Sequence, residues 1–422
     1  MHLERVNRQQ ALIALVQILG LAVWFSASAV GPALQQEWNI SAGSGVWLTA
    51  SVQIGFVAGA VTATFLGLAD RFQPQLSLGV STAGAALTTG MLAAFVEGLL
   101  PAIGLRFLTG VFLAGVYPMG MKLMASWSAP ALRGWAFGIL IGALTLGSAA
   151  PHLISSTGDL PWRNVMASAA ALAAVGALTA VLAIRPGPFA EESRARPNPR
   201  YALAMFKEQR PRLANIGYFG HMWELYALWT WLPMYLLAGQ AGGGEGRMLE
   251  TGLIVFIAMG VGGVAGAIVG GWAADRWGRP KSAAVALVVS GTCCFLSPLM
   301  FWVDSIPMLV FLIVWGAAVI ADSGVFSTSL SETADPRYVG TALTMQTALG
   351  FLLTVATIQF VPLFAAIVGW QYAFVLLLPG PLIGVLAMHK LAKTESQPVG
   401  PRIDRRRPEA DRGPSRTAGA AD

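Results

Sequence analysis

The chain has 422 residues, of which 55% are hydrophobic and only 11% are charged. Because a soluble domain carries about 25% charged residues, this composition excludes an ordinary water-soluble fold and indicates a protein embedded in a lipid bilayer. The net charge of +6 does not indicate a nucleic-acid partner, because the basic residues lack the interleaved aromatic residues that stack on bases.

Twelve apolar stretches follow one another along the chain, each long enough to cross a hydrocarbon core about 30 Å thick. They predict an all-α polytopic membrane protein, because a β-barrel would show alternating strands of about 10 residues instead. The first stretch follows Arg5 and Arg8 and resembles a secretory signal, but we interpret it as an uncleaved helix. The predicted spans are residues 10–30, 46–68, 77–97, 101–126, 134–156, 162–184, 213–237, 251–273, 282–303, 307–330, 338–367 and 370–391.

Two polar segments divide the chain into domains. Residues 1–184 are predicted to form an N-terminal six-helix bundle, and residues 213–392 a C-terminal six-helix bundle. Residues 185–212 between them form a cytoplasmic central loop. The segment 393–422 is rich in Pro, Arg and Gly, which predicts a disordered cytoplasmic tail.

The basic residues predict how the chain is oriented. If the N-terminus lies inside, most of the 27 Lys and Arg residues fall in inner segments, whereas only Arg163 and Arg247 lie outside. Basic loops stay on the cytoplasmic side of a membrane. We therefore expect a multi-pass protein of the cell (inner or plasma) membrane with both termini in the cytoplasm.

An internal repeat relates the two halves of the chain. Asp70–Arg71 follows span 2, and Asp275–Arg276 follows span 8 at the matching position. Trp162 and Trp370 likewise open spans 6 and 12. Parallel half-repeats of this kind are typical of transporters, whose substrate site lies between the halves near the membrane midplane.

The two six-span halves, the long central loop and the sequence GWAADRWGRPK at 271–281 resemble the major facilitator superfamily of secondary transporters. The resemblance implies a monomeric carrier in which spans 1, 4, 7 and 10 line a central cavity. It also implies gating loops that latch one conformation, although a plain basic loop is the alternative. In the first loop, Gln73-Pro74-Gln75 replaces the usual Gly-Arg-basic ending. The gating residues are Asp70, Arg71, Asp275, Arg276, Gly278 and Arg279.

Four charged side chains lie well inside the predicted spans: Arg106 and Lys122 in span 4, Glu224 in span 7 and Asp322 in span 10. Each costs roughly 2.5–3.5 kcal/mol at the centre of a membrane helix. These spans are the ones that the resemblance places around the cavity. We therefore expect the four charges to meet there.

The spacing within span 7 points to proton coupling. His221, Glu224 and Trp231 share one helix face, and an acid beside a histidine in a low-dielectric setting has a raised affinity for protons. Glu224 with His221 is therefore predicted to carry the proton, and Asp322 to act as a second switch. The alternative is a static ion pair between Glu224 and Arg106.

The same reasoning assigns candidate substrate contacts. Arg106 and Tyr117 can share a face of span 4, so Arg106 is predicted to bind a carboxylate. Lys122 points elsewhere unless Pro118 kinks the helix. Trp231 is the predicted substrate ring and Gln17 a polar contact from span 1, whereas the neighbouring aromatic residues of span 7 fit either a substrate wall or an interfacial belt.

The sequence therefore predicts a secondary active transporter that takes up a small organic anion or zwitterion with a proton by alternating access. No P-loop, nucleophile triad or metal-ligand cluster is present, so we expect neither an enzyme nor a cofactor. Two alternatives stay open: proton-coupled efflux of cationic or amphipathic compounds, and a membrane receptor or enzyme. The Gly-Pro pair of the family's drug exporters is absent from span 5, where Gly142 precedes Ala143, and this disfavours efflux.

Overall fold

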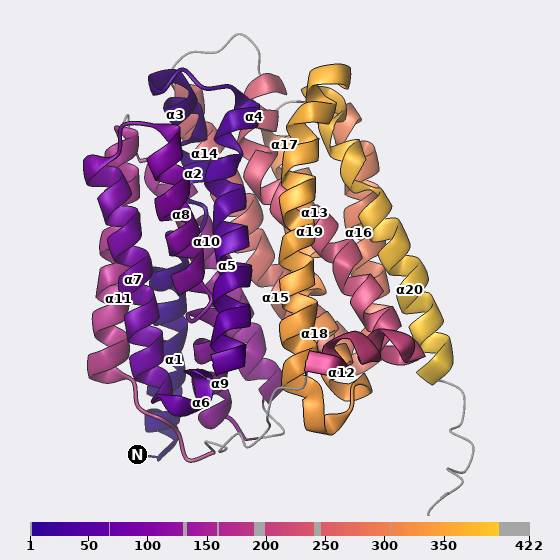
Figure 1. Ribbon diagram of the computed structural model, residues 1–422. Helices are drawn as coiled ribbons and strands as arrows, with labels where there is room; N and C mark the ends of the chain where they lie inside the picture. Colours follow the sequence, from indigo (N-terminus) through magenta and orange to yellow (C-terminus); the bar gives the residue numbers. More distant parts are fainter. Residues whose placement is uncertain are drawn as a thin grey trace, which may run out of the picture.

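The computed structural model describes residues 2–66, 68–129, 133–157, 160–189, 199–239, 246–303 and 305–395. Helices make up the regular structure of these residues, and none of them forms a strand. Figure 1 shows two groups of long helices standing side by side, one from each half of the chain. The predicted all-α fold with two six-helix bundles is thereby confirmed.

The N-terminal bundle supplies six spans, of which the first and the fourth are interrupted. Its helices are α1 (His2–Leu21), α2 (Ser26–Ala29), α3 (Gly31–Glu37), α4 (Ala42–Gly45), α5 (Trp47–Leu66), α6 (Leu68–Arg71), α7 (Pro74–Phe95), α8 (Leu99–Leu113), α9 (Tyr117–Ser126), α10 (Arg133–Ser155) and α11 (Trp162–Ala183).

The C-terminal bundle repeats this plan, with short helices before and between its spans. Its elements are α12 (Pro199–Ala204), η2 (Met205–Lys207), α13 (Gln209–Gly239), α14 (Gly246–Val255), the π-helix η3 (Phe256–Val261), α15 (Gly262–Trp277), α16 (Arg279–Met300), α17 (Ser305–Ala321), α18 (Ser323–Thr333), η4 (Pro336–Tyr338), α19 (Val339–Val368), η5 (Trp370–Leu377) and α20 (Pro379–Glu395).

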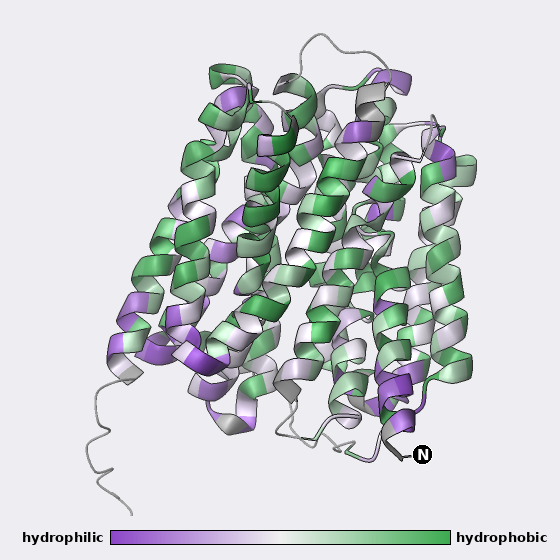
Figure 2. Cartoon of the chain, turned by 180° about the vertical axis from the view of Figure 1, so that it is seen from behind, coloured by the Kyte–Doolittle hydropathy of each residue, from purple (hydrophilic) through white to green (hydrophobic). Residues whose placement is uncertain are grey.

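Ten helical stretches of the described chain are long and apolar enough to cross a membrane. The other two spans are α1 with α2, which starts with charged residues, and α13, which is rich in polar and aromatic residues. Large apolar side chains face outward from the helices, including Phe95, Leu100 and Ile367 at 79%, 81% and 83% exposure. Such side chains suit contact with acyl chains, and Figure 2 shows that hydrophobic residues predominate along the long helices.

The start of α1 and the end of α20 lie on the same side of the molecule, at the bottom of Figure 1. We call this the inner side, after the predicted orientation, and the opposite side the outer side. The predicted domain boundaries fall close to helix ends but not on them. Helices α12 and η2 occupy part of the predicted central loop, and α20 continues through Glu395. Residues 190–198 of the predicted central loop, and residues 396–422 of the tail predicted at 393–422, lie outside the described part of the structure.

Glycines bring neighbouring helices into backbone contact within each bundle. A Cβ atom added to Gly55 of α5 would overlap the carbonyl oxygen of Phe107 on α8, and one added to Gly110 of α8 would overlap that of Val52 on α5. In the C-terminal bundle, Gly266 of α15 lies in the same way against α17. Small residues allow this approach because no side chain separates the backbones.

The two bundles meet along two seams. In one, α5 packs against α19, and the hydroxyl oxygens of Thr64 and Thr344 lie 3.3 Å apart near the inner end. In the other, α10 packs against α14, η3 and α15. The site between the halves therefore lies between these seams.

Three of the four spans expected to line the cavity are broken near their middle. Span 1 is interrupted at residues 22–25, span 4 at residues 114–116, and span 10 at Asp322. The break in span 4 immediately precedes Tyr117 and Pro118, at the place where the sequence left a proline kink open. Broken helices at membrane depth free backbone groups that neighbouring side chains must satisfy.

Candidate functional site

Arg106 of α8 fills the break in span 1. The side chain is fully buried, and its guanidinium donates hydrogen bonds to the carbonyl oxygens of Val23 at 2.9 Å and Leu48 at 3.1 Å, to that of Trp24, and to the hydroxyl of Ser26 at 3.3 Å. The break leaves the carbonyls at 23 and 24 without helical partners, and Arg106 replaces those partners. Arg106 therefore holds in place the segment that carries Trp24 and Phe25.

The other predicted contacts of the N-terminal bundle lie around the break in span 4. Gln17 is fully buried and donates to the carbonyl oxygen of Val116 at 3.0 Å, while its own amide oxygen has no partner. Tyr117 is half-buried and lies close enough to Tyr218 of α13 for electrostatic interaction across the bundles. Lys122 is half-buried on α9, the other side of the kink from Arg106.

His221 and Asp322 form a buried pair at the break in span 10. The ring nitrogen Nδ1 of His221 lies 2.9 Å from Oδ1 of Asp322, and the two side chains are 2% and 1% exposed. The other ring nitrogen, Nε2, lies 3.2 Å from the hydroxyl oxygen of Ser323. Both ring nitrogens thus have partners, and the pair joins α13 to the junction between α17 and α18.

Glu224 lies one helical turn from His221 but among different partners. Its carboxylate accepts hydrogen bonds from the hydroxyl of Ser290 at 2.6 Å, the indole N–H of Trp315 at 2.7 Å and the thiol of Cys294 at 3.4 Å. All three neighbours can donate, which suits an ionised carboxylate because it can only accept. Glu224 therefore joins α13, α16 and α17 inside the C-terminal bundle.

The structure does not bring Arg106 together with Glu224 and Asp322, so the expectation that the intramembrane charges all meet in one cavity is wrong for this conformation. Arg106 bonds only within the N-terminal bundle, and Glu224 and Asp322 only within the C-terminal bundle. The alternative pair between Glu224 and Arg106 is not formed either. The physical reason is local: the helix break satisfies Arg106, and three side-chain donors satisfy Glu224.

Aromatic rings occupy the centre of the interface between the bundles. Trp24 lies 5.2 Å from Phe56, 5.9 Å from Tyr226 and 5.7 Å from Phe351, measured between ring centroids. Phe25 contacts Tyr226 at 5.8 Å and Trp229 at 5.3 Å. We call these six residues the ring cluster. Trp24, Phe25 and Phe56 belong to the N-terminal bundle, and Tyr226, Trp229 and Phe351 to the C-terminal bundle.

Trp231, the predicted substrate ring, lies outside the ring cluster. Its indole N–H donates to the carbonyl oxygen of Ile358 at 2.8 Å, and its ring lies against Trp370. Tyr226 and Trp229, which the sequence left between two interpretations, face the other bundle instead. The alternation of apolar residues could not decide this, because α13 is buried on nearly all sides.

The second gating loop lies at the inner end of the seam between α10 and α15. Gly278 adopts a φ of 86°, a conformation that favours glycine, and Arg279 forms an ion pair with Glu332 at the end of α18. Arg276 lies over the ring of Trp272 at 5.9 Å. In the first loop, Asp70 and Arg71 end α6, Arg71 is exposed, and the side chain of Asp70 lies outside the described part of the structure.

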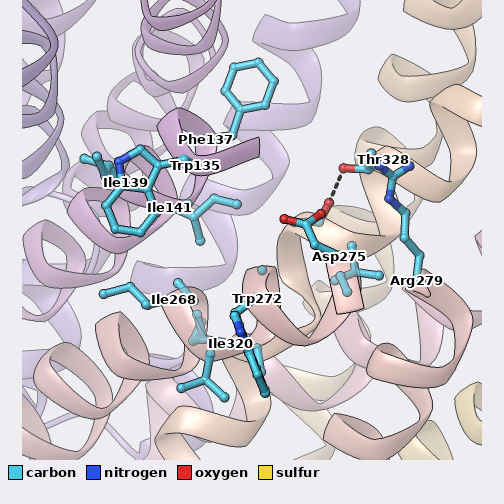
Figure 3. Close-up of a pocket in the computed structure, with 18 residues that line it drawn as sticks. Trp135, Phe137, Ile139, Ile141, Ile268, Trp272, Asp275, Arg279, Ile320 and Thr328 are labelled. Atoms are coloured by element: carbon cyan, nitrogen blue, oxygen red, sulfur yellow. Dashed lines mark hydrogen bonds between the residues drawn. The ribbon is translucent and has the colours of Figure 1, made fainter. Parts of the chain in front are cut away.

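A pocket of about 450 Å³ opens beside this loop, between the two bundles. Figure 3 shows side chains of α10, among them Trp135 and Ile141, facing Trp272 and Ile320 across it, with Asp275 toward its polar end. On the outer side the same seam is tight, because a Cβ atom added to Gly252 would lie 2.6 Å from the carbonyl oxygen of His152. The seam is therefore more open toward the inner side.

Metal chemistry has no evident location in the described part of the chain. No group of three His, Cys, Asp or Glu side chains there is placed to hold a metal ion. The polar groups of the site instead suit hydrogen bonding and proton binding: a histidine–carboxylate pair, a second buried carboxylate and one buried guanidinium.

Comparison with known proteins identifies the family that this chain matches. A family model described as the Major Facilitator Superfamily matches residues 13–358 and 250–417. The chain is 26% identical over 323 residues to a gallate transporter of Pseudomonas putida, covering 68% of this chain and 70% of that protein. It is 26% identical over 391 residues to a gentisate transporter of Corynebacterium glutamicum, covering 87% and 83%.

A solved structure supports the fold alone. The xylose transporter XylE from E. coli, in a partially occluded inward-open conformation, superimposes with a TM-score of 0.69 at 13% identity, covering 92% of this chain and 99% of that chain.

Proposed function

The chain belongs to the major facilitator superfamily of transporters, and from this membership we propose that it takes up a small organic anion or zwitterion together with a proton by alternating access. The two bundles would rock about the ring cluster, opening the site to one side of the membrane at a time. The observation that carries the proposal is the separation of charge between the bundles, with a buried cation in one and buried acids with a histidine in the other.

The anion preference rests on Arg106. Its guanidinium is fully buried and bonded to neutral oxygen atoms, and no acidic side chain of the described residues neutralises it. A buried charge without a counter-ion is costly, so an anion bound near Trp24 would be stabilised by it. The relatives named for gallate and gentisate are consistent with an anionic substrate. Tyr117, Gln17 and Lys122 are the further substrate contacts that we propose from the sequence.

The proton step rests on the C-terminal bundle. Asp322 and Glu224 are both fully buried and interact electrostatically, and their described partners are a histidine, an indole, a hydroxyl and a thiol rather than Lys or Arg. When a proton binds His221, the charge of its pair with Asp322 falls from −1 to zero. This neutral form is cheaper to move through a closed, dry interface, which couples proton binding to the rocking motion.

The remaining assignments follow from the predicted orientation. We propose that the protein acts as a monomer in the cell membrane with both termini in the cytoplasm. The loops at Asp70–Arg71 and Asp275–Arg279 would latch the inner side when it closes.

Transport by purified protein in liposomes tests the proposal. Under an imposed pH gradient, wild type should accumulate labelled gentisate, whereas Asp322→Asn should lose accumulation but still exchange external for internal gentisate. Glu250→Gln, which removes an exposed acid at the start of the span formed by α14 and α15, is the control and should behave as wild type. Undiminished accumulation by Asp322→Asn would show that the proton does not travel through this pair.

A further inference from the structure

We infer that the ring cluster is the substrate site and that the substrate is an aromatic acid. Its ring would replace the contacts between the two halves of the cluster. Its oxygen atoms would accept hydrogen bonds from the indole N–H groups of Trp24 and Trp229. This inference rests on the proposed function, because it assumes that an organic anion is carried, and it names the chemical class and the residues that recognise it.

The first support is the position of the cluster. In the ring cluster, three rings of the N-terminal bundle pack against three rings of the C-terminal bundle. The ring centroids of Phe56 and Phe351 lie 4.4 Å apart, and those of Trp24 and Tyr226 lie 5.9 Å apart. These contacts must separate whenever the bundles move apart. An aromatic ligand can enter there and restore edge and face contacts with both halves, which an aliphatic ligand of the same size cannot do.

The second support is a pair of unsatisfied donors. The Nε1 atoms of Trp24 and Trp229 are buried without a hydrogen-bond partner. Most other buried indoles in the described chain donate to an oxygen atom, and the one further exception, Trp38, packs against Trp162 away from the cluster. Buried donors are normally satisfied. Trp24 and Trp229 belong to opposite bundles, so their two unsatisfied N–H groups lie on opposite sides of an interface that must move. A ligand whose oxygen atoms accept hydrogen bonds from both groups would explain why neither has a partner within the protein.

Nearby polar groups fit the same ligand. Gln53 is fully buried one helical turn from Phe56, and both polar atoms of its amide lack partners. Arg106 donates to the carbonyl oxygens of Val23 and Trp24, which belong to the two peptide groups that flank Trp24, so its positive charge lies beside the backbone of the residue that carries one of the unsatisfied donors. A carboxylate at Trp24 would gain from this charge without touching the guanidinium.

Two conservative variants isolate the donors. Trp24→Phe and Trp229→Phe keep a ring in place and remove only the indole N–H. Each should weaken gentisate binding roughly tenfold to a hundredfold, the effect of losing one hydrogen bond to a charged group. Their melting temperatures in the absence of ligand should be unchanged or higher, because an unsatisfied donor has been removed.

Trp231→Phe is the matched control. It lies on the same helix as Trp229 and is buried to a similar degree, but its N–H already donates to the carbonyl oxygen of Ile358. It should lower the melting temperature and leave gentisate affinity within about twofold of wild type. A merely structural role for Trp24 and Trp229 would produce this same pattern for them.

A comparison of ligands on wild type needs no variant. Gentisate should bind at least tenfold more tightly than cyclohexanecarboxylate, which has a carboxylate on a saturated ring of similar size. Equal uptake of the two acids, with unchanged gentisate affinity in Trp24→Phe and Trp229→Phe, would overturn this inference and leave the proposed function standing. Absence of uptake of any organic anion would overturn both.

Discussion

Replacing Arg106 with glutamine should destabilise the N-terminal bundle. The guanidinium donates to the carbonyl oxygens of Val23, Trp24 and Leu48 and to the hydroxyl of Ser26. The Leu48 carbonyl also lies within α5, and the Val23 carbonyl also accepts from the Ser26 hydroxyl at 2.9 Å, so the Trp24 carbonyl depends most on Arg106. The side chain is fully buried, so water cannot replace the lost donors.

The size of the effect follows from the carbonyl that loses its donor. An unsatisfied buried acceptor costs about 1–3 kcal/mol, and the carbonyl of Trp24 has no other donor among the described hydrogen bonds. Arg106→Gln and Arg106→Leu should therefore each lower the free energy of unfolding by at least about 1–3 kcal/mol. Because native proteins are stable by only about 5–15 kcal/mol, this is a measurable share of the total.

Arg163 provides the matched control. It also donates to two backbone carbonyls, of Ala93 and Val96, but its side chain is 33% exposed, so water can take its place. Arg163→Gln should change stability by no more than about 1 kcal/mol. The assay is the temperature at which the detergent-solubilised protein loses its monodisperse peak on size-exclusion chromatography. If Arg106→Gln melts at the same temperature as Arg163→Gln, Arg106 does not hold the break in span 1.

Three further predictions concern other parts of the molecule. Glu224→Gln should abolish proton-driven accumulation while retaining exchange, and accumulation at the wild-type level would remove Glu224 from the proton step. Gly278→Ala forces a side chain into a backbone with φ 86° and ψ 149° and should cost about 1–3 kcal/mol in thermal unfolding, whereas Gly271→Ala, in a helix with open space around it, should not destabilise. The hydrogen bonds that Arg337 donates hold the pKa of Asp335 below its usual 3.8. Because the folded-state pKa is the lower one, this contribution is complete above pH 3.8 and is lost as the pH falls through the folded-state value, so acid should destabilise wild type more steeply than Arg337→Gln.

Much of the fold follows from the sequence because the bilayer imposes simple rules. Apolar length predicts the twelve spans, and the repeat of Asp70–Arg71 at Asp275–Arg276 predicts the two halves. Pro118 marks the place where span 4 is interrupted. Each of these signals is local, or repeats at a fixed spacing. None depends on which helix packs against which.

The site was less predictable because its geometry depends on packing. The spacing along α13 predicted that Glu224, His221 and Trp231 share a face. It did not predict that Glu224 would contact Ser290 while His221 contacts Asp322. Nothing in residues 22–25 marks a helix break; the break exists because Arg106, far along the chain, satisfies the carbonyls it frees. Signals for the ring cluster were present in Trp24 and in the aromatic density of span 7, but only the structure pairs them.

The most direct test of the account is a measurement of proton movement with the substrate. Liposomes holding the wild-type protein and an internal pH indicator would receive external gentisate with no pH gradient imposed, with protein-free liposomes as the blank. The account predicts that the interior acidifies as gentisate enters, and that Asp322→Asn abolishes the acidification. Entry of gentisate through the wild-type protein at constant internal pH would contradict it.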